Sequence, residues 1–140
     1  MRKIYLYLAI FIGGGFFGWV LDTAYRSLVI GEYMPGTLMP FFAFIYAFGA
    51  VMLYAFFSVG NISFWPQVII GTVLCVALEF FGGVVSLYLL GYRLWDYSAR
   101  PLNVYGFIDI EHAVYWFFLT VVYRFSHKFF ESSSFVRKGR

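Results

Sequence analysis

The chain has 140 residues, of which 62% are hydrophobic and only 12% are charged, and its formal net charge is +3. A water-soluble domain usually carries about 25% charged residues, and a small domain buries too little of its surface to hide this much apolar area. The composition therefore excludes a disordered chain, a disulfide-stabilised secreted module and a cytosolic enzyme. It predicts an integral membrane protein.

Four apolar segments are candidates for membrane-spanning helices, each of which needs about 20 mainly apolar residues. They lie at about residues 4–30, 39–59, 66–90 and 107–125. The fourth is the most polar, because Asp109, Glu111 and His112 lie in its first turns. We therefore expect an all-α membrane protein in which residues 1–140 form one membrane domain, a bundle of four transmembrane helices.

The distribution of Lys and Arg predicts the orientation of this bundle, because cytoplasmic loops carry an excess of both. With four spans, the two termini and the 60–66 connection share one side of the membrane. That side holds seven of the ten basic residues: Arg2, Lys3, Arg124, Lys128, Arg137, Lys138 and Arg140. The opposite side holds Arg26, Arg93 and Arg100. We expect a multi-pass protein of the cell membrane with both termini in the cytoplasm and a short basic tail over 126–140.

The third connection, 91–106, is long for a link between two helices. Connections of this length are usually functional or disordered, and this one lacks the composition of a disordered segment. Trp95 and Tyr97 are suited to anchoring at the membrane interface, and Asp96 is suited to bonding the turn that follows it. The sequence therefore predicts an ordered loop.

Acidic residues recur at one depth of the predicted bundle. With a rise of about 1.5 Å per residue, Asp22, Glu79 and Asp109 lie about 27, 20 and 22 Å from the cytoplasmic ends of their helices. Charged groups inside a bilayer are costly and normally face the bundle interior. Glu79 shares a helix face with small residues, namely Gly71, Cys75, Gly82 and Ser86. We expect Glu79 either to pair with Arg26, Arg93 or Arg100, or to be a protonatable group beside a cavity.

Structural interpretations of the same residues stay open. The first segment carries a stripe with four-residue spacing, made of Gly14, Gly18, Asp22 and Arg26. Small residues at this spacing favour close helix packing, and Asp22 and Arg26 have the spacing of an ion pair. Asp109 and Glu111 are acids that would stabilise the first turn of a helix by ~0.3–1 kcal/mol. His112 would suit a hydrogen-bonded interior position.

Several classes of site have no signature in this sequence. It contains neither a Gly-rich phosphate-binding loop with Lys-Ser/Thr nor Cys/His spacing typical of a metal site, and it has no nucleophile motif. We expect no cofactor, no metal and no nucleic-acid partner. Any use of ATP would require a separate subunit.

One stretch of the third connection resembles a known family. Residues 94–106, Leu-Trp-Asp-Tyr-Ser-Ala-Arg-Pro-Leu-Asn-Val-Tyr-Gly, resemble the W-D-Y-S-x-x-P-x-N-x-x-G stretch of the "putative ABC-transporter type IV", or CmpB-like, membrane proteins. Gly18-Trp19, with Asp22 and Tyr25-Arg26 after it, is similar to the family's G-W-x-x-E-x-x-Y-R.

The resemblance extends along most of the chain. Residues 45–50 are similar to the family's P-I-Y-G-F-G-A, and Leu78-Glu79 matches the acid of its third helix. Residues 34–40, Met-Pro-Gly-Thr-Leu-Met-Pro, depart from the family's R-G-F-L-x-G-P. The resemblance implies a permease-like membrane component with an unknown substrate.

Two functions from different classes follow. The first is a permease-like component of a transport system, which acts in the lipid bilayer as a homo-oligomer or with other membrane subunits, including a separate ATPase. Its candidate substrate- or ion-binding residues are Asp22, Arg26, Glu79, Arg93, Asp96, Arg100, Asn103, Asp109 and His112. Because four helices are few to enclose a transport pathway within one chain, we expect further copies of the chain or other subunits as partners.

The alternative is a membrane-embedded enzyme or binding protein for lipid or cell-envelope head groups at the outer leaflet. Arg26, Arg93 and Arg100 would hold an anion, and Glu79 or His112 would act as the base. The missing nucleophile motif favours the permease over an enzyme. A purely structural role in assembly is a third possibility.

Overall fold

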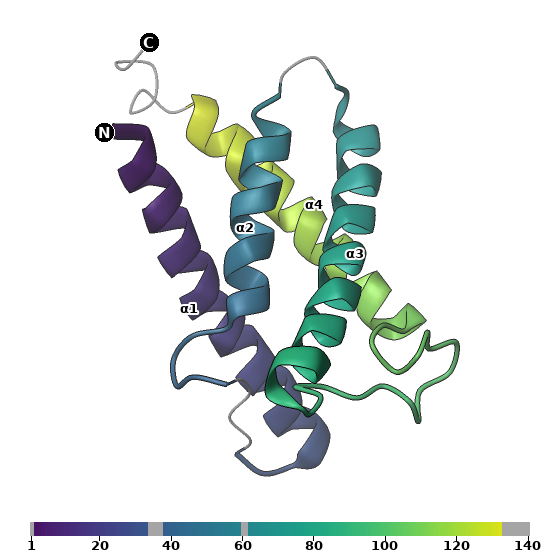
Figure 1. Cartoon of the computed structure of the whole chain (residues 1–140). Helices are drawn as coiled ribbons and strands as arrows, with labels where there is room; N and C mark the ends of the chain where they lie inside the picture. Colours follow the sequence, from purple (N-terminus) through teal and green to yellow (C-terminus); the bar gives the residue numbers. More distant parts are fainter. Residues whose placement is uncertain (1, 34–37, 60–61, 133–140) are drawn as a thin grey trace. The chain divides into compact units, whose positions relative to one another are not determined.

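The computed structural model describes residues 2–33, 38–59 and 62–132. These residues form four helices and no β-strand: α1 (Arg2–Ile30), α2 (Phe44–Phe57), α3 (Phe64–Leu90) and α4 (Ile110–Ser132) (Figure 1). The prediction of an all-helical protein is therefore confirmed. Part of the first connection, residues 34–37, lies outside the described residues, as do residues 60–61 and the end of the basic tail, 133–140.

The start of the second helix was predicted wrongly. It begins at Phe44 and not at residue 39, because residues 39–42 form a tight turn in which Phe41 has a left-handed backbone with φ of 61°. The backbone N–H of Ala43 then donates to the carbonyl of Gly15 in α1, at 2.9 Å, and so does not continue a helix of its own.

The fourth helix is also shifted from its predicted bounds. It begins at Ile110 and not at residue 107, because Asp109 caps its first turn by accepting a hydrogen bond from the backbone N–H of His112 at 2.7 Å. It continues to Ser132, past the predicted end at residue 125, because helix formation needs no apolar composition once a helix has started. The described part of the expected tail, residues 126–132, is therefore helical.

The chain separates into two compact units. The first consists of Met1–Met52 and Gly82–Leu94, and the second of Leu53–Phe81 and Trp95–Arg140. Each contains parts of α2 and α3, and each is described by itself. The single membrane domain expected over residues 1–140 stays a prediction.

In the first unit, α1 packs on the start of α2 through glycines. A Cβ atom added at Gly14 would lie 2.5 Å from the Cβ of Ala50, and one added at Gly18 would collide with the side chain of Tyr46. Ala47 is completely buried in this contact region. The prediction that Gly14 and Gly18 pack tightly against another helix is therefore confirmed.

In the second unit, α3 packs on α4 through residues that recur every four positions. We call this contact the α3–α4 seam; it consists of Gln67, Gly71, Cys75 and Glu79 on α3 and Trp116, Thr120 and Arg124 on α4. A Cβ atom at Gly71 would lie 3.0 Å from Thr120, so the helices approach closely. Most of the seam is polar and buried, with Gln67 and Thr120 exposed by 1% or less.

Two of the described helices are long and apolar enough to cross a membrane, over Lys3–Ile30 and Phe64–Leu90. Both leave large apolar side chains exposed, such as Phe17 and Phe81, which is the surface expected of helices that face lipid. The apolar helix α2 is shorter, at 14 residues. The bundle of four membrane spans stays a prediction.

Candidate functional site

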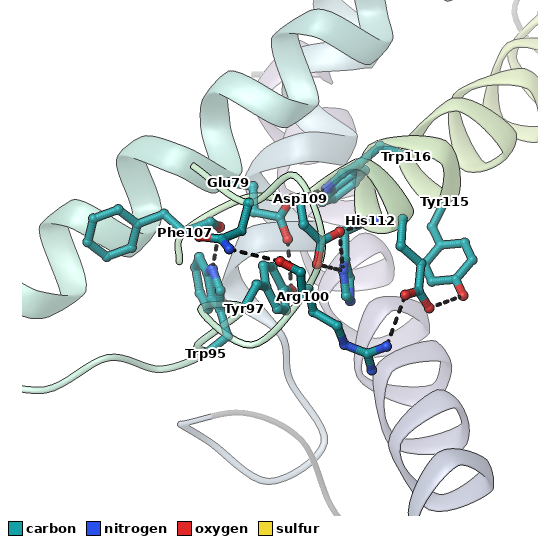
Figure 2. A network of polar contacts seen from close by, with 11 residues as sticks. Glu79, Trp95, Tyr97, Arg100, Phe107, Asp109, His112, Tyr115 and Trp116 are labelled. Atoms are coloured by element: carbon teal, nitrogen blue, oxygen red, sulfur yellow. Dashed lines mark hydrogen bonds and ion pairs between the residues drawn. The ribbon is translucent and has the colours of Figure 1, made fainter. Parts of the chain in front are cut away.

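Glu79 is buried in the second unit between two aromatic hydrogen-bond donors. Its Oε1 accepts a hydrogen bond from the Tyr97 hydroxyl at 3.0 Å, and its Oε2 accepts one from the Trp116 indole Nε1 at 2.9 Å (Figure 2). The residue is only 6% exposed. Both of its oxygens are therefore satisfied by neutral groups from the loop and from α4.

Two of the three arginines expected as partners of Glu79 pair with other carboxylates. Arg100 pairs with Glu111 at 3.0 Å, and Arg26 pairs with Asp22 at 2.9 Å. Among the described residues of the second unit, no hydrogen bond or ion pair joins Glu79 to an arginine. Arg26 and Arg93 belong to the first unit, so pairing of Glu79 with either of them stays a prediction.

Asp109 and His112 form a second buried polar pair at the start of α4. The Asp109 side chain is completely buried, and besides capping the helix it contacts the His112 ring. The His112 Nδ1 lies 2.9 Å from Oδ1 and 3.0 Å from Oδ2 of Asp109. Because an ionised carboxylate only accepts hydrogen bonds, this geometry requires a proton between the ring nitrogen and the carboxylate. Asp109 therefore has two structural roles: it caps the first turn of α4, and it contacts His112 in the polar cluster.

Tyr97 joins the two pairs. Its ring stacks on the His112 ring with centroids 3.9 Å apart and an interplanar angle of 17°, while its hydroxyl reaches Glu79. Figure 2 shows this side chain beneath Glu79 and beside His112. We call Glu79, Tyr97, Asp109, His112 and Trp116 the buried acid cluster.

The loop that carries Tyr97 is held together by its own polar groups. The Asp96 Oδ1 accepts a hydrogen bond from the backbone N–H of Ser98 at 2.9 Å. The Asn103 amide donates to the carbonyl of Arg100 at 2.8 Å, and its Oδ1 accepts from the backbone N–H of Gly106 at 3.0 Å. Asp96 and Asn103 thus contact the loop backbone and set the position of Tyr97.

Further anchors tie the same loop to its surroundings. The Trp95 indole donates to the carbonyl of Phe107 at 2.9 Å, and the backbone N–H of Tyr97 donates to the carbonyl of Gly106 at 2.9 Å. Gly106 has a φ of 72°, a backbone conformation that glycine adopts without strain. The W-D-Y-S-x-x-P-x-N-x-x-G pattern therefore describes a folded loop, in agreement with the predicted order.

An ion pair lies at the edge of the cluster. Arg100 and Glu111 are partly exposed, at 41% and 36% of their side chains, and Glu111 also accepts a hydrogen bond from the Tyr115 hydroxyl at 2.7 Å. Since Glu111 neutralises Arg100, this arginine contributes little net positive charge to the cluster.

The charges of the cluster do not balance. Glu79 and Asp109 supply two negative charges when ionised, and His112 supplies at most one positive charge. The cluster is therefore negative unless it takes up a proton or a cation. Within the described residues, no group of three or more His, Cys, Asp or Glu side chains is arranged to hold a metal ion.

The structure divides the predicted site residues between the two units. Glu79, Asp96, Arg100, Asn103, Asp109 and His112 belong to the second unit, and Asp22, Arg26 and Arg93 to the first. Asp22 and Arg26 form the ion pair that their spacing indicates. The functional role of all nine stays a prediction.

Two aromatic residues of the cluster were missed by sequence reasoning. Trp116 follows His112 by four positions and Asp109 by seven, so it lies on the same helix face, and this spacing was a usable signal. Tyr97 had no such signal, because its place depends on the fold of the loop. Tyr97 was expected to anchor at the membrane interface, where Tyr and Trp are enriched, and Trp116 was not singled out.

Comparisons with known proteins give one positive result. No curated protein matches the chain, and no solved structure does. A family model described as "Putative ABC-transporter type IV" matches residues 9–138, which is nearly the whole chain. The chain therefore belongs to this family, in agreement with the resemblance of its 94–106 stretch.

Proposed function

We propose that this protein is a permease-like membrane subunit of a transport system. Its family carries a transporter description, and two of its helices are long and apolar enough to span a bilayer. We further propose that it is a multi-pass protein of the cell membrane with both termini in the cytoplasm. The excess of basic residues near the termini supports this orientation.

The buried acid cluster is the observation that carries the proposal. Ionisable side chains within membrane helices are costly, and they typically mark substrate pathways or proton relays. Glu79 lies in the middle of a candidate span, and the Asp109–His112 pair lies one tyrosine away from it. Helix packing alone would not require the Asp109 carboxylate so close to Glu79. The arrangement is suited to binding and releasing a proton during transport.

Partners are part of the proposal. The sequence has no phosphate-binding loop for ATP, so ATP-driven transport would need a separate ATPase. A chain of this size also offers few helices to enclose a pathway. We therefore propose that it acts as a homo-oligomer or with other membrane subunits.

The alternative, a protein that acts on lipid or cell-envelope head groups, receives less support. It relied on arginines to hold an anion, and both Arg26 and Arg100 are ion-paired with acidic residues. An anion at either residue would have to compete with a carboxylate that is already bound. The permease-like function is therefore the better supported of the two.

Purification from native membranes tests the proposal. The tagged chain, expressed at its natural level and extracted in a mild detergent, is expected to bring down an ATP-hydrolysing subunit. Glu79→Gln keeps the size of the side chain and removes its charge, so this variant should bring down the same subunit but lose transport in cells. Recovery of the chain without an ATPase, together with turnover of lipid head groups by the purified protein, would contradict the proposal.

A further inference from the structure

Arg124 lies in the second unit, at the end of the α3–α4 seam away from Glu79. Its Nε donates a hydrogen bond to the Oε1 of Gln67 at 2.6 Å. Its guanidinium lies over two aromatic rings, 5.5 Å from the centroid of Phe57 and 6.0 Å from that of Phe64. Gln67 is almost completely buried, so the arginine is held in a defined position.

This guanidinium lacks a negatively charged partner among the described side chains. The Arg124 Nη1 is buried and makes no hydrogen bond there. The one hydrogen-bond acceptor that it does have, Gln67, is neutral. A buried charged donor without an acceptor is costly, so an anionic acceptor at this position would be stabilising.

A second basic residue lies one helical turn further along α4. His127 is 5% exposed, and its Nε2 lies 3.3 Å from the hydroxyl of Ser58, just after the end of α2. Its ring packs on Tyr54 with centroids 5.3 Å apart. Arg124 therefore adds positive charge, and His127 adds a polar ring, to a place where α2 ends and α3 begins.

The exposed surface around Arg124 is apolar. Phe125, Phe129 and Trp65 are all more than half exposed, and they flank Arg124 in α4 or lie beside Gln67 in α3. Large exposed apolar side chains next to a half-buried arginine are the surface expected at the edge of a bilayer, where lipid phosphates lie.

We propose that Arg124, positioned by Gln67 and assisted by His127, binds a phosphate-type anion, either the phosphate of a lipid head group or free phosphate. A planar guanidinium binds such an anion through two parallel N–H donors. This site is separate from the buried acid cluster, and the proposal does not depend on a transport function.

Thermal unfolding of the purified full-length protein in a neutral detergent tests the site. Phosphatidylglycerol, added in the detergent micelles, is expected to raise the melting temperature by several degrees, because a ligand that binds only the folded state stabilises it. Arg124→Gln should abolish the shift. Lys3→Gln removes the same charge in the first unit and should keep it. A shift with phosphatidylglycerol alone identifies a lipid phosphate, and an equal shift with inorganic phosphate identifies free phosphate.

Gln67→Glu provides a second test that does not require removal of the arginine. The new carboxylate would lie against Arg124 and take the place of the anion. We therefore expect a folded protein that melts at a higher temperature without ligand and no longer responds to phosphatidylglycerol or phosphate. The proposal is overturned if neither anion shifts the wild type, if Arg124→Gln responds like the wild type, or if Gln67→Glu keeps the full response.

Discussion

The α1–α2 contact of the first unit and the α3–α4 seam of the second both use stripes of residues four positions apart, but they join their helices differently. In the first, glycines bring the backbone of α1 against Tyr46 and Ala50, and the stripe acts by its shape. In the second, an acid and an amide bind an indole and a guanidinium, and the stripe acts by its polar groups. The four-residue spacing therefore identifies which face of a helix makes a contact. The residues on the facing helix decide whether that contact is held by shape or by polar groups.

The shape-based contact is expected to be the more sensitive to added volume. Gly18→Leu should abolish the folded yield or destabilise the protein by at least about 3 kcal/mol, because its Cβ would occupy the position of the Tyr46 side chain. Gly13→Leu is the matched control, since a Cβ there meets nothing within 4 Å. Yield and melting temperature in detergent provide the measurement. Equal stability of the two variants would mean that α1 does not pack on α2 as described.

The polar contact is expected to respond to loss of hydrogen-bond acceptors. Glu79→Leu should destabilise the protein by about 2–4 kcal/mol, because it leaves the Trp116 indole and the Tyr97 hydroxyl without an acceptor. Glu79→Gln keeps one carbonyl oxygen and should cost about 1 kcal/mol. Chemical or thermal unfolding distinguishes the two variants. If both melt like the wild type, Glu79 has no role in holding the seam.

A smaller and more local effect is expected in the loop that completes the seam. Asn103→Ala removes the hydrogen bonds to Arg100 and Gly106 and should cost about 1–2 kcal/mol. Chymotrypsin cleavage after Tyr105 should become about tenfold faster, because cleavage follows the population of the open loop. Asn103→Asp keeps the acceptor and should be cleaved at an intermediate rate. Rapid cleavage of the wild type itself would contradict the ordered loop.

The smallest effects are expected at the two ion pairs, one in each unit. Arg26→Gln and Arg100→Gln should each cost less than about 1 kcal/mol, because the arginines are 35% and 41% exposed and water screens their charges. The cost should fall further at high salt, which melting curves at two salt concentrations would show. A loss of several kcal/mol in Arg100→Gln alone would place that residue inside the cluster and not at its edge.

The existence and approximate positions of the helices could be predicted from apolar runs, but their ends could not. The late start of α2 depends on a bond between Ala43 and Gly15 in another helix, and no local pattern contains that information. The cap of α4 by Asp109 was within reach, because acids next to a first turn are a known start signal.

The candidate site was predictable to the same extent. The four-residue pattern placed Glu79 on the buried face of its helix, and the three-residue spacing placed His112 near Asp109. The hydrogen-bond partners of Glu79 were not predictable in this way, because they are neutral side chains and the expected partners were charged arginines. A buried carboxylate can equally be satisfied by neutral donors such as the Tyr97 hydroxyl, and the position of that tyrosine depends on the whole loop.

The four-residue spacing of the seam also constrains the angle between its helices. Rows of residues four apart are inclined to a helix axis, and two such rows fit together when the axes cross at about 50°. Helices that cross diverge away from their closest point, and the close approach of Gly71 to Thr120 lies within this seam. Tyr97 donates a hydrogen bond to Glu79 at one end of the seam, so the loop is part of this helix contact, and shortening it would remove a hydrogen bond that an ordinary connection does not make.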